Sequence, residues 1–339
     1  MPELHIAPDP LMSPADPEVA AIESGPSAPT KRKLGVGGWI CAGWLILLVV
    51  VSIFAPLLKA DPVVNDRGRV VEGCGTGKGL PIYDPFDCRD LQAKRAQTSG
   101  EGSGKFTHLA GVDSSGRDTF SQTLLGTRTT LLIAFFSILA ATVVGGLLGL
   151  VSGYFGRKLD IVITGVFDVM VAFPALVLAL LIVTFFSPPD DPSGAARRVP
   201  GIIIALAIVA VPILGRIARA STLTWAEREF VTAARALGAK PFRIIFRDVL
   251  PNVAPAMMSI AMLGVGIVIV TEASLAILGL GVPDDTMSWG RVVAAGGANF
   301  RTYPHLVFVP GVAIVITVCA LNFLGDALRQ KFDVRESAL

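Results

Sequence analysis

Six long stretches of the chain contain no charged side chain. Counted between consecutive charged residues, they are 34–58, 129–156, 169–189, 199–215, 249–271 and 302–325. A helix needs roughly 20 apolar residues to cross the hydrocarbon layer of a membrane. The shortest stretch, 199–215, reaches this length if the aliphatic stem of Arg216 lies along the apolar surface. The pattern predicts an all-α membrane protein with six transmembrane helices rather than a soluble domain with six buried helices.

The composition agrees with this prediction. Hydrophobic residues make up 52% of the chain and charged residues 17%, and the mean hydropathy is +0.64. A soluble domain of 339 residues would carry more charge and shorter uncharged runs. The net charge is only +2, so nothing in the balance indicates a nucleic-acid partner.

The chain divides into four parts. Residues 1–30 are rich in Pro, Ala and acidic side chains without apolar periodicity, which predicts a disordered tail. Residues 31–58 hold the first apolar run, which is too long for the core of a signal peptide and is expected to remain as an anchor. Residues 59–107 are expected to form an extracytoplasmic loop. Residues 108–339 are expected to form the main transmembrane domain, with a cytoplasmic connection at 221–254.

The basic residues predict the orientation. Lys31, Arg32 and Lys33 stand directly before the first apolar run, and the positive-inside rule places that end in the cytoplasm. With six spans, the basic connection 216–247 and the basic C-terminal tail lie on the same side. Both termini are therefore expected to be cytoplasmic.

The four cysteines fall into two classes. Cys74 and Cys88 share the predicted outer loop and are the one candidate pair for a disulfide, which an oxidising exterior would permit. Cys41 and Cys319 lie inside apolar runs and are expected only to pack there.

Small residues and prolines mark particular positions in the spans. A stripe of one glycine every four residues predicts close approach by another helix, and it consists of Gly145, Gly149 and Gly153. Kinks or local openings are expected at prolines inside spans, namely Pro174, Pro212 and Pro310. The sequence GRD at 116–118 is expected to cap and anchor the start of the second span.

A basic, alanine-rich segment interrupts the apolar pattern between the fourth and fifth runs. Within it, Phe230, Ala234 and Leu237 recur at i, i+4 and i+7, which predicts a helix over 227–238 with a small apolar face. Gly238 is a typical helix end. Such a helix either docks into a groove of a cytoplasmic partner or lies on anionic lipid headgroups. The residues alone leave both alternatives open.

The segment resembles the signature "EAA" loop of bacterial ATP-binding cassette importer permeases. The family pattern is Glu-Ala-Ala, three residues, Gly, nine residues, Ile, one residue, Leu-Pro. The chain departs from it at two positions, with Thr232 for the first Glu and Asp248 for the Ile. In that family the loop is a coupling helix that seats in a cleft of the ATPase subunit. The resemblance therefore implies a coupling role for Glu227, Phe230, Thr232, Ala233, Ala234, Leu237, Gly238, Leu250 and Pro251.

Further stretches resemble the dipeptide/oligopeptide branch of the same family. They are 111–132, 160–180, 272–290 and 310–335. Gly165 departs from the pattern, because relatives often carry Arg there. Residues 1–30 and much of 60–105 lie outside the resemblance.

The resemblance implies a type I importer permease fold, with one N-terminal anchor helix before a five-helix core. The implied partners are a homologous second permease subunit, two cytoplasmic ABC ATPase subunits, an extracytoplasmic substrate-binding protein and the lipid bilayer. ATP and Mg²⁺ would bind to the ATPase subunits, so this chain is expected to hold no cofactor and to be no enzyme. The branch handles di- and oligopeptides, while similar permeases carry nickel chelates, glutathione or other small solutes. The expected location is the cytoplasmic membrane of a bacterium.

Two carboxylates lie at membrane depth, where an unpaired charge is costly. Asp168 lies in the third span before Pro174, and Glu272 lies in the fifth span toward its outer end. Each either lines a hydrated path or gate, or is a buried partner in a hydrogen bond or ion pair. Arg216 and Arg219 are the candidate partners for carboxylates near the inner side.

Other chemistry has little support in the residues. The sequence EGCGTGKGL at 72–80 imitates a phosphate loop, but Glu72 replaces its first Gly and Gly79 follows the Lys. The three histidines are dispersed, and no spacing is that of a metal site. An ion-coupled carrier would predict paired inverted repeats, which are not visible. A membrane scaffold with a non-ATPase partner is the remaining rival class.

Overall fold

The computed structural model describes residues 36–54, 110–113, 115–188 and 194–336. All named elements in these ranges are helices, as the hydrophobic pattern predicts. The predicted tail at 1–30, the whole predicted loop at 59–107 and the candidate disulfide between Cys74 and Cys88 lie outside the described residues.

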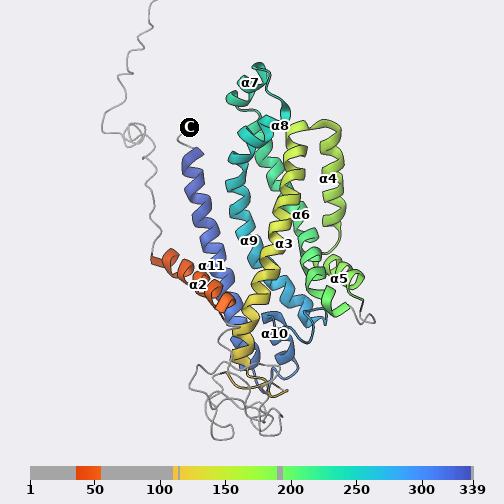
Figure 1. The fold of residues 1–339 in the computed structure, drawn as a ribbon, viewed down its shortest axis with the longest axis vertical. Helices are drawn as coiled ribbons and strands as arrows, with labels where there is room; N and C mark the ends of the chain where they lie inside the picture. The colour runs from red at the N-terminus through yellow and green to blue at the C-terminus, as the bar shows by residue number, and fades with distance from the viewer. Residues whose placement is uncertain (1–35, 55–109, 114, 189–193, 337–339) are drawn as a thin grey trace, which may run out of the picture.

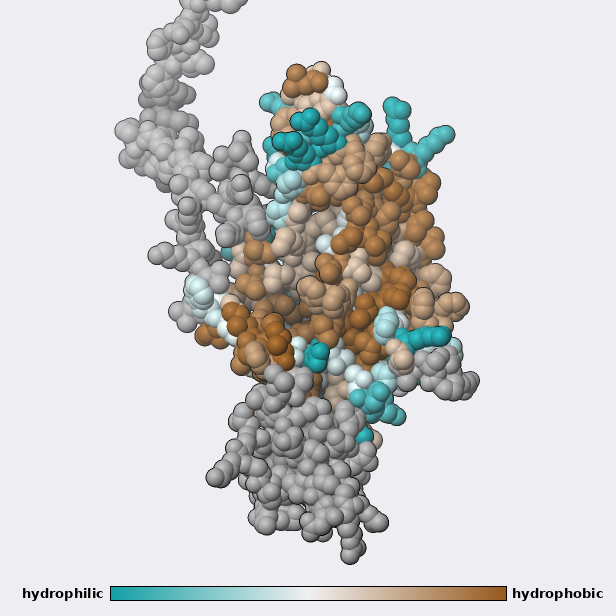
Figure 2. Space-filling model, in the orientation of Figure 1, coloured by the Kyte–Doolittle hydropathy of each residue, from teal (hydrophilic) through white to brown (hydrophobic). Residues whose placement is uncertain are grey.

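The described helices form an elongated bundle, with the short helix α7 at one end and α10 at the other (Figure 1). Hydrophobic side chains cover the middle of the bundle, and hydrophilic ones gather towards its two ends (Figure 2). In chain order the elements are α2 (Val36–Phe54), α3 (Thr119–Phe155), α4 (Arg157–Ala172), α5 (Ala175–Phe186), α6 (Gly194–Ala226), α7 (Glu229–Ala236), α8 (Pro241–Arg243), the π-helical turn η2 (Ile244–Val249), α9 (Leu250–Ile277), α10 (Trp289–Gly297) and α11 (His305–Glu336).

The predicted number of spans is found, although one span is not a single helix. Among the described residues, five helical stretches are long and apolar enough to cross a membrane, and the bent pair α4–α5 makes a sixth. The five are contributed by α2, α3, α6, the continuous stretch from α8 to α9, and α11. The fold is therefore an anchor helix, α2, followed by a core of five spanning segments.

The third span is broken and begins earlier than its uncharged run. α4 starts at Arg157 and contains Asp160 and Asp168. Both carboxylates form ion pairs with arginines of α6, so their charges are compensated within the helical bundle. At Pro174 the chain bends as predicted, and α4 and α5 meet at 93°. Proline disfavours helical geometry in the residue before it, and Phe173 is accordingly extended, with φ −82° and ψ 136°.

The predicted glycine stripe is the contact between α3 and α6. A Cβ atom at Gly145 would lie 2.5 Å from the carbonyl oxygen of Val211, and one at Gly149 would lie 2.3 Å from that of Gly215. At Gly153 the nearest atom would be the Cβ of Thr222 on α6, at 2.8 Å. The two backbones touch along this line because no side chain separates them, which is the packing that small-residue stripes provide in membranes.

The anchor helix α2 contacts the bundle along α11. The indole Nε1 of Trp44 donates a hydrogen bond of 3.1 Å to Oγ1 of Thr317, and Leu48 is buried. In Figure 1, α2 crosses obliquely beside the half of α11 that is nearer to α10. Of the two cysteines in these helices, Cys41 is half-buried and Cys319 is exposed, and both are free thiols.

The glycine contact between α3 and α6, which we call the glycine seam, should lose stability when a single methyl group is added to it. Gly149→Ala would place its Cβ 2.3 Å from a backbone oxygen, and overpacking of this kind destabilises by about 1–3 kcal/mol. Gly165→Ala is the matched control, because no atom lies within 4 Å of its Cβ position and Ala stabilises a helix interior by about 0.5–1 kcal/mol relative to Gly. Unfolding of the purified protein in detergent should show lower stability for Gly149→Ala only. Equal stability of the two variants would contradict the seam.

Candidate coupling surface and membrane ion pairs

The short helix α7 projects beyond the spanning helices (Figure 1). It begins two residues later than the predicted helix, at Glu229, and Gly238 ends it as predicted. Gly238 has φ +78° and donates to the carbonyl of Arg235, while Ala239 donates to the carbonyl of Ala234. This pair of bonds is the Schellman motif, in which Gly is favoured because left-handed geometry costs other residues about 1 kcal/mol.

One buried side chain places α7 in an apolar cluster with residues of four other elements, and the direct contacts of α7 are chiefly with η2. Val231 is fully buried, whereas its neighbours on both sides along α7 are exposed. The guanidinium of Arg235 lies 5.1 Å from the ring centroid of Tyr154 at the end of α3, within cation–π range. A displacement of α7 is therefore expected to act first on η2, which α7 contacts directly. The apolar residues clustered with Val231 come from α3, α6, η2 and α9, and include Leu150, Ala218, Ile245 and Val253.

The predicted apolar stripe of α7 is divided between two faces. Phe230 and Leu237 are exposed, as expected for a docking face. Ala234 is half-buried and packs inward beside Leu250 in the Val231 cluster. The residues of α7 that face the bundle, Val231 and Ala234, are three positions apart. This i, i+3 spacing is the signal in the sequence that could have identified Val231 as the buried residue.

We call the outward apolar face at this end the coupling surface, defined as Phe230, Ala233, Leu237 and Phe242. Leu237 is 89% exposed and Phe242 of α8 is 73% exposed, although both are large apolar side chains. The remaining predicted coupling residues of the helix also lie at the surface. These are Glu227, in the turn before α7, and Thr232.

The predicted Leu250-Pro251 pair lies at the start of α9, where the π-helical turn η2 gives way to a regular α-helix. The N–H of Leu250 donates to the carbonyl of Ile245, five residues earlier, and the turn is accordingly π-helical. Pro251 has no N–H to donate, and its ring would clash with the carbonyl four residues earlier in a regular α-helix. The wider turn accommodates this proline, and π-turns of this kind are frequent at functional sites. Leu250 is half-buried and Pro251 is exposed.

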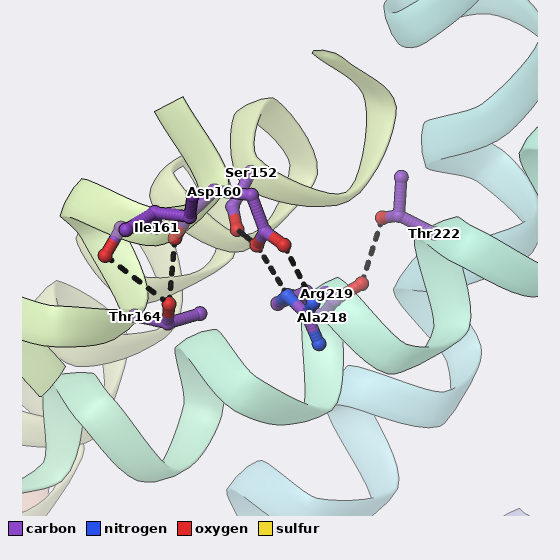
Figure 3. A network of polar contacts seen from close by, with 7 residues as sticks. All are labelled: Ser152, Asp160, Ile161, Thr164, Ala218, Arg219 and Thr222. Atoms are coloured by element: carbon purple, nitrogen blue, oxygen red, sulfur yellow. Dashed lines mark hydrogen bonds and ion pairs between the residues drawn. The ribbon is translucent and has the colours of Figure 1, made fainter. Parts of the chain in front are cut away.

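A polar network joins α3, α4 and α6 near the α7 end of the bundle (Figure 3). Asp160 of α4 accepts from Arg219 of α6 through both oxygens, with Nε–Oδ1 2.5 Å and Nη2–Oδ2 2.6 Å. The hydroxyl of Ser152 on α3 donates to the same carboxylate at 2.5 Å. The two charged side chains are only 21% and 32% exposed. Arg219 was predicted as a partner from the sequence but Asp160 was not, because Asp160 lies outside the uncharged runs, between 129–156 and 169–189.

The second ion pair of α4 is built differently. Nη2 of Arg216 lies 2.6 Å from Oδ1 of Asp168, so the predicted partnership is found. It consists of one contact rather than two, and the side chains of Arg216 and Asp168 are 45% and 69% exposed. Asp168 is therefore both paired and accessible, which combines the two alternatives raised by the sequence.

Glu272 is buried at the opposite end of the bundle. Its Oε1 accepts a 2.8 Å hydrogen bond from the hydroxyl of Ser288, which also caps α10 by accepting from the N–H of Arg291. Trp289 completes the contact with α3, because its backbone N–H donates to Thr130 Oγ1 at 3.0 Å. The carboxylate thus sits between α9 and the start of α10, away from the surface. Among the described residues, no group of three or more His, Cys, Asp or Glu is placed to hold a metal ion.

The GRD sequence caps the second span as predicted. Asp118 is the N-cap of α3, and its Oδ1 accepts from the N–H of Ser121 at 2.7 Å. Asp113 closes the loop before it, because its carboxylate accepts from the N–H of Arg117 and from the amide of Gln122. These bonds satisfy donors that a helix start otherwise leaves unpaired.

Comparison with known proteins places these features in a family. Residues 145–337 match the family described as "Binding-protein-dependent transport system inner membrane component". The dipeptide transport system permease protein DppC of Alkalihalophilus pseudofirmus is 33% identical over 305 residues, which cover 89% of this chain and 86% of the relative. The chain belongs to this family of transport permeases. The family match spans both ion pairs, the α7 segment and Glu272.

Other relatives agree with this assignment. The glutathione transport system permease protein GsiD of Pectobacterium atrosepticum is 36% identical over 226 residues, covering 67% of this chain and 72% of the relative. A putative peptide permease protein of Brucella ovis is 34% identical over 257 residues, covering 75% and 81%. Among solved structures, an inward-facing conformation of the MetNI methionine ABC transporter matches with TM-score 0.52 at 20% identity, covering 63% of this chain and 95% of that one. The last match shows the shared fold, and the predicted importer permease fold is confirmed.

The two ion pairs of the permease should differ in their contribution to stability. Asp160→Asn removes the carboxylate charge and one of the two acceptor oxygens that the half-buried Arg219 uses, and a hydrogen bond to a charged group contributes about 1.5–3 kcal/mol. Asp168→Asn is the control on the same helix, because its pair is more exposed and exposed pairs contribute about 1 kcal/mol or less. Unfolding in detergent should therefore show a larger loss for Asp160→Asn. The reverse order would contradict the assignment of Asp160 as the structural pair.

Proposed function

We propose that this permease is a membrane subunit of an ATP-driven importer of di- and oligopeptides, and that it forms half of the translocation path. The observation that carries the proposal is the coupling surface, an exposed apolar face of α7 whose buried Val231 packs into an apolar cluster with residues of α3, α6, η2 and α9. Support for the substrate class comes from the relatives that are named as dipeptide and peptide permeases.

In this proposal the α7 end faces the cytoplasm. Exposed basic side chains gather there, and the positive-inside rule associates such residues with the cytoplasmic face. They include Arg157, Lys158, Arg228, Arg235, Lys240 and Arg243. The α10 end then faces the exterior, where the substrate-binding protein docks.

Two ATPase subunits supply the work, and ATP and Mg²⁺ bind to them rather than to this chain. One ATPase receives the coupling surface, whose exposed Leu237 and Phe242 offer apolar knobs for a groove. Closure of the ATPases on ATP displaces α7. The Val231 cluster passes that displacement to α3, α6 and α9, which alternately open the path to the two sides. A homologous second permease subunit provides the other half of the path.

The two carboxylates have different roles in this mechanism. Asp168 is accessible and belongs to the path or its gate. Glu272 is buried and bonded to Ser288, so it positions α10 against α9 rather than contacting solute.

Glutathione is the second candidate substrate. It is favoured by the 36% identity to the glutathione permease of Pectobacterium atrosepticum. Glutathione is itself a small peptide, so the same path chemistry would serve both solutes.

The coupling surface should be needed for ATPase association but not for folding. Leu237→Asp would bury a charge in the groove of the ATPase and lose an apolar knob, which we expect to lower the amount of copurified ATPase by about tenfold or more. Leu237→Met is the matched control, because it retains an apolar side chain of similar size. Both variants should insert and unfold normally, because Leu237 is 89% exposed in the isolated permease. Normal ATPase recovery with Leu237→Asp would contradict the docking role.

The substrate class can be tested by uptake in cells. Deletion of this gene should abolish binding-protein-dependent accumulation of radiolabelled dialanine, and expression of the intact chain should restore it. Excess unlabelled glutathione separates the two candidates, because it competes only if the importer accepts it. Unchanged dialanine uptake in the deletion strain, with loss of glutathione uptake, would reject the peptide proposal in favour of the second candidate.

A further inference from the structure

One flank of α4 carries an ion pair at membrane depth. Asp168 is eleven residues beyond Arg157, the first residue of α4, and thus about 16 Å along the helix at 1.5 Å per residue. The hydrocarbon layer is about 30 Å thick. The pair of Asp168 with Arg216 therefore lies near the middle of that layer rather than at either boundary.

This pair is too exposed to face lipid. The Asp168 side chain is 69% exposed and Arg216 is 45% exposed. Charged groups at this depth are costly in hydrocarbon, and they face a protein interior or a water-filled cavity. Exposed apolar side chains surround this pair on α4, with Ile161 on the same flank as Asp168 and Val162 and Val166 on the opposite one.

The break between α4 and α5, next to this ion pair, also indicates contact with water on this part of the helix. All residues from 171 to 177 are exposed, including extended Phe173 and the Pro174 that follows it. No side chain caps the start of α5, and the first N–H groups of any helix lack intrahelical acceptors. Irregular backbone does not occur in contact with lipid at membrane depth, but it lines water-filled cavities. The break lies within the hydrophobic band of the bundle (Figures 1 and 2).

The two ion pairs of α4 differ in whether a ligand can bind to their charged groups. Asp160 uses both oxygens on Arg219 and also accepts from Ser152, so its carboxylate is already fully engaged. Asp168 uses one oxygen on one nitrogen of Arg216. The remaining oxygen of Asp168 and the other guanidinium N–H groups are open to a ligand. The first pair fixes α4 to α6, and the second is free to exchange partners.

We propose that Asp168 and Arg216 form an exchange site for zwitterions in a water-filled path. The terminal ammonium group of a peptide pairs with Asp168, and its terminal carboxylate pairs with Arg216. The exchange leaves no charge uncompensated, because one ion pair is replaced by two, and the net charge of the site with its ligand stays at zero. When the peptide leaves, the side chains pair again, so the empty path carries no isolated charge. This inference rests on the peptide substrate of the proposed function.

The hydration of the flank can be tested with two single cysteines in the assembled importer, after replacement of the native cysteines by Ser. Ala172→Cys lies one turn from Asp168 on the same flank. Val166→Cys is the control at almost the same depth, two residues from Asp168 and about 160° around the helix. A charged thiosulfonate reagent should modify Ala172→Cys about tenfold faster or more, because thiols in lipid stay protonated and inaccessible to ions. Equal rates would overturn the water-filled flank.

Recognition can be tested by protection of Ala172→Cys in inside-out vesicles. Millimolar dialanine should slow the modification several-fold, whereas N-acetyl-dialanine and dialanine amide, which each lack one terminal charge, should protect much less. Adding Asp168→Asn or Arg216→Gln should remove the protection by dialanine while modification without peptide stays fast. Equal protection by all three compounds, or full protection in both variants, would overturn the exchange site.

These outcomes remain separate from failure of the proposed function. If dialanine uptake does not depend on this gene, the peptide assignment fails, although fast modification of Ala172→Cys would still support a hydrated flank. If uptake depends on the gene but dialanine gives no protection, peptide transport stands and the exchange site is wrong.

Discussion

The direct backbone contact between α3 and α6 is the constraint on which the other features depend. Gly149 approaches Gly215 closely enough that no side chain fits between them. With α3 held against it, α6 presents Arg216 and Arg219 to α4 on one side and leads directly into the α7 segment at its end. The positions of the ion pairs, the coupling surface and the Val231 cluster therefore all depend on how α3 and α6 pack together.

The charges of α4 illustrate how a membrane helix can contain carboxylates. Phe167 is the one buried side chain among the described residues of α4, and its ring fills the space beside Gly215. Ion pairs to α6 supply much of the remaining attachment. A helix held in this way needs little apolar burial against its own subunit, which leaves its other faces available to lipid, to water or to a second subunit.

The sequence predicted the spans, the glycine stripe and the break at Pro174 because each depends on local chemistry: length without charge, absence of a side chain, absence of an N–H. The third span was predicted to include Asp168, but its uncharged run starts only at 169 and omits most of α4, because Asp160 and Asp168 are compensated by arginines far along the chain. It also assigned Ala234 to the outer face of α7. The actual inward residue, Val231, packs into a cluster with residues of four other elements, and the period of a short helix does not specify such packing.

The glycine seam also limits the motions open to the permease. Helices separated by side chains can slide as those side chains change rotamer, but Gly145 and Gly149 place backbone against backbone, with nothing able to rearrange. α3 and α6 should therefore keep their register and behave as one rigid strut, about 55 Å long from the 37 residues of α3. Flexing is left to the broken third span, which meets that strut only from the side.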